Sequence, residues 1–226
     1  MKRFLFAGEG LTDYIVIKNL LIGFFKDKNL AISRLLPKDK EPVGWGNVLN
    51  YLSTDEFREG VNNTDHIVVQ IDTDKCEEWN EGLQNIGNNT DNLDDFVQGV
   101  IAVLITRIGQ DFFTQNKGKF LFAISIHDIE CWLLPFIADQ PAHQSKMVGC
   151  VNAVERIAKK HGISINQKNY EDGKHYEKFS QDMKKHNTLM QKHSLNPSLK
   201  IFINMLRTAF PATPPPQPEA QEPEQP

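Results

Sequence analysis

The chain has 226 residues, of which 40% are hydrophobic, and this suffices for one sizeable core with room for a small second lobe. Its formal net charge of -4 argues against a general basic coating of the kind that histone-like nucleic-acid binders carry. No apolar run approaches the roughly 20 residues that a membrane helix needs, and the apolar start is too short for a signal peptide. We therefore expect a soluble, cytoplasmic protein without membrane association.

The three cysteines are Cys76, Cys131 and Cys150, an odd number without a Cys-x-x-Cys pair. Such a set favours reduced thiols in a cytosol over a disulfide framework, and its spacing disfavours a zinc site.

Strand and helix patterns alternate through the first 139 residues. Residues 3–7 form a short apolar run that ends at Gly8-Glu9-Gly10, and Thr12 then has the character of an N-cap for an apolar helix. Three more apolar runs predict strands at residues 30–36, 66–71 and 120–126, and helical patterns cover 47–57, 93–113 and the segment opening at Cys131. The alternation predicts an α/β fold, a mostly parallel sheet with helices on both faces.

The remainder predicts a small helical C-terminal extension. Helical patterns cover residues 148–161, 179–192 and 198–210, whereas 162–178 is polar and is expected to be rich in loops. From residue 211 the chain is rich in Pro and Glu, without an apolar anchor, and we expect a disordered tail. The predicted organisation is thus a catalytic core at 1–139, an extension packed on it at 140–210 and the tail at 211–226.

Acidic residues follow three of the predicted strands. Glu9 follows the first strand, Asp72 and Asp74 follow the third, and the fourth is followed by His127, Asp128 and Glu130. The carboxyl ends of parallel strands share one edge of a sheet, where ligands collect. Carboxylates crowded there would repel one another unless a cation neutralised them, and Mg²⁺ prefers such oxygen ligands.

The Asp-x-Asp spacing has its own consequence. Alternate residues on an extended strand point the same way, so we expect Asp72 and Asp74 to face one ion, with Thr73 turned aside.

Two of these motifs resemble a known family. Gly8-Glu9-Gly10-Leu11-Thr12-Asp13 resembles the Glu-Gly-x-Thr-Asp/Glu opening of TOPRIM domains, and Asp72-Thr73-Asp74 resembles their Asp-x-Asp after the third strand. Ile129-Glu130-Cys131-Trp132-Leu133-Leu134 further resembles a signature of short, stand-alone prokaryotic TOPRIM-like proteins related to OLD-type nucleases. Many of those are encoded with anti-phage defence systems or with ATPase partners. The resemblance covers about residues 1–139.

The resemblance implies a TOPRIM-like, Rossmann-like sheet and a Mg²⁺-dependent nuclease that hydrolyses phosphodiester bonds of DNA or RNA, with Mn²⁺ able to substitute. It implies metal ligands at Glu9, Asp72 and Asp74, with Glu130 as an added acidic group, and Glu9 as an alternative acid or base. The chain lacks the longer acidic run that some members carry after the Asp-x-Asp, which leaves one-metal and two-metal chemistry open. A second ion would need more carboxylate ligands, which Glu130 or Asp128 could supply. A nuclease of this kind would be a defence effector controlled by a partner such as an ATPase, and could be a homo-oligomer.

Two further residues are candidates for the chemistry. His127 is a general base or a phosphate contact, or else a histidine hydrogen-bonded at a strand end. Lys178 could steady transition-state charge, as a lysine does in related nucleases. The basic run Lys184-Lys185-His186 either grips phosphates or forms a solvated helix face.

Two other classes of function remain open from the sequence. One is a non-catalytic TOPRIM-like interaction module that docks on a partner protein. The other is a phosphatase or phosphotransferase with Asp72 as nucleophile, but in those enzymes the Asp-x-Asp usually follows the first strand, where this chain has Glu9.

Overall fold

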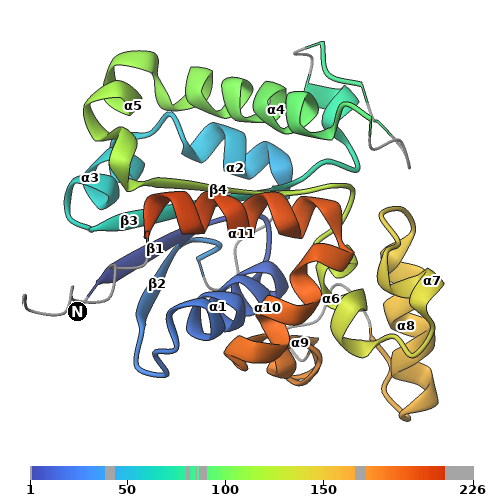
Figure 1. Ribbon diagram of the computed structural model, residues 1–226. Helices are drawn as coiled ribbons and strands as arrows, with labels where there is room; N and C mark the ends of the chain where they lie inside the picture. Colours follow the sequence, from blue (N-terminus) through green and yellow to red (C-terminus); the bar gives the residue numbers. More distant parts are fainter. Residues whose placement is uncertain are drawn as a thin grey trace, which may run out of the picture.

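A computed structural model describes residues 2–38, 44–79, 82–84, 86, 91–165 and 172–211 (Figure 1). Its sheet has four parallel strands in the order β2-β1-β3-β4. Their bounds are β1 Arg3–Ala7, β2 Ala31–Leu36, β3 His66–Asp72 and β4 Phe120–Ser125. The prediction of an α/β fold with a mostly parallel sheet is confirmed.

Helices cover both faces of the sheet, because side chains on each strand alternate between two apolar cores. Phe4, Phe6 and Val68 belong to one core, whereas Ile67 and Val69 belong to the other. Figure 1 shows α2, α3, α4 and α5 over one face. Their bounds are α2 Trp45–Tyr51, α3 Asp55–Asn62, α4 Leu93–Ile108 and α5 Gln110–Asn116. The other face carries α1 Leu11–Phe25, α6 Glu130–Ile137, α8 Cys150–Lys160, α9 Asp172–Phe179 and α10 His186–Lys192.

The C-terminal helices share a core with the first 139 residues, and α11 (Pro197–Ala209) lies along β4 (Figure 1). The ring of Trp132 on α6 stacks on Phe202 of α11 with 5.5 Å between centroids. Its Nε1 donates a 2.7 Å hydrogen bond to Ser198 Oγ. Both Trp132 and Ser198 are buried, so this bond satisfies polar atoms that water does not reach. Short elements complete the described chain, namely α7 Pro141–Gln144 and the 3₁₀ turns Cys76–Trp79, Lys117–Lys119, Gln181–Lys184 and His193–Leu195.

Several predicted helix boundaries are wrong. The helix predicted at 93–113 is broken at Gly109, whose φ of 93° is open mainly to glycine. The helix predicted at 47–57 is two helices, because Thr54 accepts a hydrogen bond from the Phe57 amide and so caps the start of α3. Part of the segment predicted to be loop-rich, 162–178, is the helix α9. The predicted tail beyond residue 211 lies outside the described residues.

The prediction of reduced thiols is wrong for two of the three cysteines. Cys131 and Cys150 form a disulfide between α6 and α8, and Cys76 is buried with a free thiol. The pairing follows from the packing of α8 against α6, which neither the spacing nor the number of cysteines indicates.

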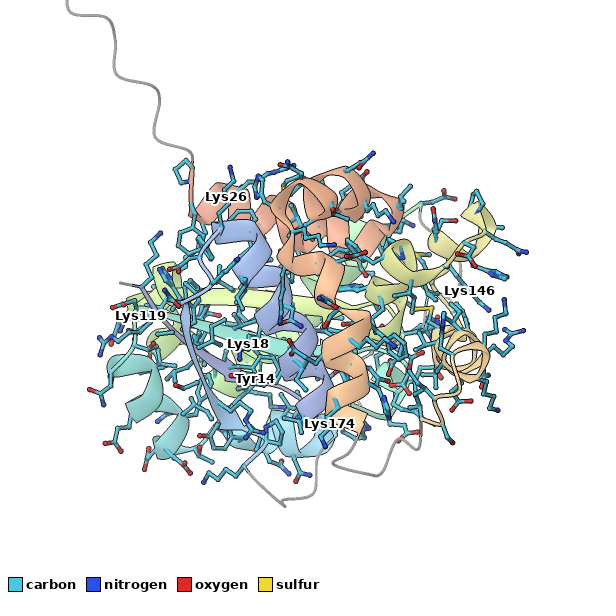
Figure 2. The ribbon with its side chains drawn as sticks, turned by 90° about the horizontal axis from the view of Figure 1, so that it is seen from below. Tyr14, Lys18, Lys26, Lys119, Lys146 and Lys174 are labelled. Atoms are coloured by element: carbon cyan, nitrogen blue, oxygen red, sulfur yellow. A yellow bond between two sulfur atoms is a disulfide. The ribbon has the colours of Figure 1, made fainter. Side chains whose placement is uncertain are left out.

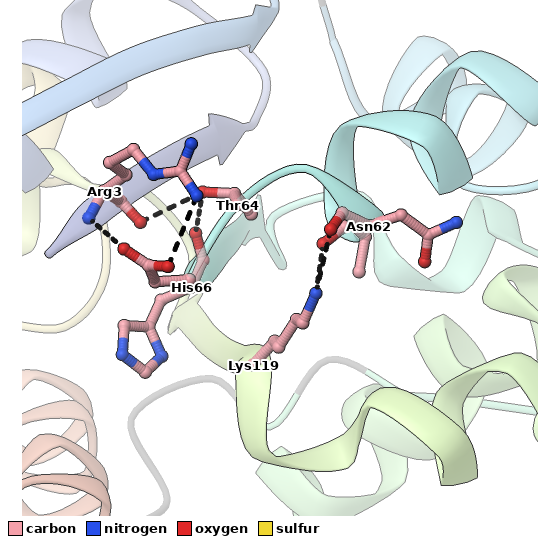
Figure 3. A network of polar contacts seen from close by, with 7 residues as sticks. Arg3, Asn62, Thr64, His66 and Lys119 are labelled. Carbon is pink, nitrogen blue, oxygen red and sulfur yellow. Dashed lines mark hydrogen bonds and ion pairs between the residues drawn. The ribbon is translucent and has the colours of Figure 1, made fainter.

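At the amino-terminal edge of the sheet, a polar network joins the starts of the strands (Figure 3). The Arg3 amide donates a 2.8 Å bond to the Asp65 carboxylate, and Thr64 Oγ1 donates a 3.0 Å bond to the Arg3 carbonyl. Lys119 Nζ donates to the carbonyls of Val61 and Asn62, at 2.8 and 3.3 Å. These bonds fix the loop before β3 against β1 and against the turn that leads into β4.

No single helix in the described parts of the chain combines the length and apolar character of a membrane span. Two consecutive helical segments, Leu93–Ile108 and Gln110–Lys119, have that length and apolar character only when taken together, and the chain bends by 104° between them.

Candidate metal centre

A pocket of about 270 Å³ opens at the carboxyl edge of the sheet, and most of its polar side chains are acidic. It lies where β1, β3 and β4 end, the edge at which open α/β sheets bind ligands. The lining residues are Glu9, Gly10, Thr12, Asp13, Gly44, Asp72, Asp128, Glu130, Val151 and Tyr176.

Three carboxylates form the centre of the pocket. One oxygen each from Asp72, Asp128 and Glu130 lies within 4.8 Å of the others. Asp72 ends β3, Asp128 lies in the turn after β4, and Glu130 begins α6. A set made only of carboxylate oxygens suits a hard cation such as Mg²⁺ or Mn²⁺, which binds oxygen and retains several waters. The donor set therefore fits the predicted ion.

Glu9 is held at the rim by backbone bonds. Its Oε1 accepts a 2.6 Å hydrogen bond from the Asp72 amide. The Glu9 amide in turn donates 3.1 Å to Gln70 Oε1, and Gln70 Nε2 donates 2.9 Å to Asp72 Oδ1. A Cβ at Gly8 would lie 2.6 Å from the Gln70 oxygen, so glycine permits this close approach. Gln70 thus orients both acidic residues, a role that the sequence analysis missed.

Asp13 is the fifth acidic group of the pocket, after Asp72, Asp128, Glu130 and Glu9. It lies in the first turn of α1, is only 5% exposed, and accepts a 3.4 Å hydrogen bond from Thr12 Oγ1. Asp13 belongs to the motif after the first strand, but the sequence does not indicate its place in the pocket.

Tyr176 joins the site from α9, more than forty residues further along the chain. Its hydroxyl donates a short hydrogen bond to Glu130 Oε1, and both side chains are buried. Because the bond leaves one carboxylate oxygen of Glu130 facing the other acids, Tyr176 orients this group. The contact of Tyr176 with Glu130 has no sequence signal, because the polar composition of residues 162–178 predicts a loop-rich segment.

Burial is the main cause of the unusual titration of these groups. It raises the pKa of Glu9 to about 8 and that of Glu130 to about 7, with neighbouring carboxylates adding to the effect. Burial likewise raises the pKa of Asp13 and of Asp128 to about 6, and that of Asp72 well above its usual value. Without a cation the cluster therefore retains protons near neutral pH, and a cation would displace them.

The end of β4 carries a buried hydroxyl next to Asp72. Ser125 is the register partner of Asp72, and its Oγ has no hydrogen-bond partner among the described residues. Register partners in a parallel sheet face the same side, so this hydroxyl lies beside the acidic cluster. It is a polar atom that the water shell of a bound cation could satisfy.

Asp74 is not brought into the pocket together with Asp72. Its side chain is exposed, because β3 ends at Asp72 and the alternation of an extended strand stops there. Thr73 instead ties two loops together: its buried Oγ1 accepts a 3.0 Å bond from the His127 amide, and its amide donates 2.9 Å to the His127 carbonyl.

His127 is held in the left-handed region, with a φ of 59°. Its ring lies outside the pocket lining; burial lowers its pKa, and the charge of Asp74 opposes that shift. Its carbonyl fixes the turn that presents Asp128 and Glu130.

Lys178 lines a different cavity. That cavity, of about 270 Å³, is bounded by apolar side chains of α6, α8 and α9 and by Asp182. Of the six predicted site residues, the structure brings Glu9, Asp72 and Glu130 to the acidic pocket, and leaves Asp74, His127 and Lys178 outside its lining.

A scan against models of known protein families finds no match to this chain, and a search of the curated proteins finds none either.

Proposed function

We propose that the protein is a Mg²⁺-dependent nuclease that hydrolyses phosphodiester bonds at the acidic pocket. One observation carries the proposal: oxygens of Asp72, Asp128 and Glu130 converge within 4.8 Å at the carboxyl edge of a parallel sheet. The resemblance of the strand-end motifs to TOPRIM domains gives the reaction class. The cytoplasm is the compartment that we propose for the enzyme.

The residues would divide the chemistry as follows. Asp72, Asp128 and Glu130 hold the ion, which when bound polarises the phosphate and activates water. Glu9, held beside Asp72 by the hydrogen bond from the Asp72 amide, would act as the acid or base toward the leaving oxygen. Gln70 fixes Glu9 relative to Asp72, and Tyr176 fixes Glu130.

The direct test incubates the purified full chain with plasmid DNA, single-stranded DNA and RNA in MgCl₂, in MnCl₂ and in EDTA. We expect cleavage of at least one substrate in either metal and none in EDTA. Asp72→Asn and Glu130→Gln each remove a carboxylate with little change in shape, and we expect each to reduce the rate at least a hundredfold. Glu59→Gln, at an exposed position of α3, is the matched control and keeps the full rate.

Two results would overturn the proposal. One is that no substrate is cut in either metal; the other is that cutting persists in both pocket variants. If metal binding is also absent by calorimetry, the non-catalytic interaction module is the better explanation. Control by a partner such as an ATPase, in anti-phage defence, rests on the resemblance alone.

Asp74→Asn distinguishes the ligand set predicted from the sequence from the triad Asp72, Asp128 and Glu130 that we propose. Because Asp74 lies outside the triad, we expect this variant to retain metal affinity within about threefold, whereas Asp128→Asn loses at least tenfold.

A further inference from the structure

A second cavity, of about 610 Å³, lies at the other end of α1 from the acidic pocket. The amino-terminal end of α1 supplies Gly10, Thr12 and Asp13 to the acidic pocket, and its carboxyl-terminal end supplies Phe24, Phe25 and Lys26 to the second cavity. Figure 2 shows Lys26 at one end of α1 and Lys174 at the other. The two sites are therefore distinct.

The cavity is cationic. Lys2, Lys26 and Arg207 line it, together with His186, whose Nδ1 lies 3.0 Å from the Gly23 carbonyl oxygen, and no acidic residue of the described chain does. Within the described residues, no ion pair joins Lys2, Lys26 or Arg207 to a carboxylate. Among the described residues, the Arg207 guanidinium donates hydrogen bonds to Asn204 Oδ1 and Met190 Sδ, each at 3.4 Å. These three charges are thus available to an anion.

Two other basic side chains, Arg3 and Lys119, already bind partners within the protein, unlike the charged groups of this cavity. Arg3 pairs with Asp65, and Lys119 donates to two carbonyls at the start of the sheet (Figure 3). Asp27, next to Lys26 in sequence, accepts from the Asn29 amide and does not line the cavity.

Aromatic rings form the apolar wall. Phe25 and Phe210 meet edge to face with 4.9 Å between centroids, and Lys2 Nζ lies 4.1 Å from the centre of the Phe210 ring. Both side chains are partly exposed, so part of each ring borders the cavity. Aromatic side chains of this kind stack on bases in single-strand binding proteins.

We propose that this cavity binds a phosphorylated nucleoside, with the base beside Phe25 and Phe210 and the phosphate between Lys26 and Arg207. Cationic donors recognise phosphate oxygens, and the volume is within the range of small-molecule sites. The ligand is either a free nucleotide or the phosphorylated end of a single strand, since both present the same chemistry. The site does not depend on the proposed nuclease activity.

The test is isothermal titration calorimetry of the full chain in EDTA, which leaves the acidic pocket without metal and prevents cleavage. The probes are AMP, adenosine, inorganic phosphate and a six-nucleotide oligoadenylate with and without a 5′-phosphate. We expect AMP to bind at least tenfold more tightly than adenosine or phosphate, and its affinity to fall with added salt. Tighter binding of the phosphorylated strand than of AMP identifies a strand end as the ligand; the reverse identifies a free nucleotide.

Variants locate the binding. Lys26→Gln combined with Arg207→Gln should weaken AMP binding at least tenfold, and Phe210→Leu should weaken it about fivefold or more while sparing the salt dependence. Arg156→Gln, at an exposed site on α8, is the control and should bind as the unsubstituted chain does. The proposal is overturned if neither AMP nor the phosphorylated strand binds, if inorganic phosphate binds as tightly as AMP, or if both cavity variants bind normally.

Discussion

Replacing Glu130 by Gln should make the metal-free protein more stable, even though the side chain is buried and hydrogen-bonded. Glutamine has nearly the same shape, and its amide oxygen can accept the Tyr176 hydroxyl as the carboxylate does. What the substitution removes is a negative charge beside Asp13 and Asp128, both of which raise the pKa of Glu130.

The size of the effect follows from that pKa. Burial raises it from 4.5 to about 7, so the folded protein holds the proton more tightly than the unfolded chain. Stability from this group is fully present below pH 4.5 and is lost as pH rises through about 7. At pH 8 the ionised group costs about 3 kcal/mol, at 1.36 kcal/mol per pKa unit. The stability advantage of Glu130→Gln should therefore grow by about 3 kcal/mol between pH 4.5 and pH 8.

Urea unfolding followed by circular dichroism measures this difference, with the disulfide intact, in EDTA and in MgCl₂. A cation at a hundred times its dissociation constant stabilises the folded state by about 2.7 kcal/mol. We expect that gain in the unsubstituted protein at pH 8 and little of it in Glu130→Gln. Glu59→Gln should follow the unsubstituted protein in every condition. A Glu130→Gln protein that is less stable in EDTA at pH 8, with an unchanged pH dependence, would refute the account of a self-repelling cluster.

Three other substitutions or treatments have definite expected outcomes. Tyr176→Phe removes a hydrogen bond that lowers the pKa of Glu130, so the midpoint of Mn²⁺ binding should move to higher pH, whereas a role in packing alone would leave that midpoint in place. Gly23→Ala should cost more than about 2 kcal/mol in urea unfolding, because a Cβ there would overlap the carbonyl oxygen of Met183, and Gly46→Ala, with open space around it, should be tolerated. Reducing the Cys131–Cys150 disulfide should lower the free energy of unfolding by about 3 kcal/mol, given a sequence separation of 19 between the two cysteines, and an unchanged unfolding midpoint in reductant would contradict this expectation.

The strands β3 and β4 were predictable because each is a short run buried on both faces. β3 and β4 came within a residue or two of their predicted bounds, since every side chain of these runs must avoid water. The breaks were harder to predict. The helical spacing of apolar residues continues on both sides of Gly109. Periodicity alone therefore predicts one continuous helix where the structure has two.

The acidic pocket was predictable only where its residues lie directly after strands. Glu9, Asp72 and Glu130 follow strand ends, and parallel strands bring their carboxyl ends together. Gln70 lies inside the run that forms β3, and no local pattern indicates that its side chain contacts Glu9 and Asp72. Tyr176 reaches Glu130 through the packing of α9 on α1, a contact between distant segments that no local pattern encodes.

Helix α1 connects two regions of opposite charge. Thirteen residues separate Asp13 from Lys26, which at 1.5 Å per residue is about 20 Å. The partial positive charge at the start of a helix favours the acids, and the partial negative charge at its end favours the lysine, so the backbone dipole suits both ends. Twenty ångströms is more than two screening lengths at physiological ionic strength, about 8 Å each. Substitutions at the two ends should therefore combine additively. The net charge of -4 thus sums over two separate regions, an acidic one at the start of α1 and a basic one at its end. Helix α1 holds them so far apart that the charge of one has little effect on ligand binding at the other.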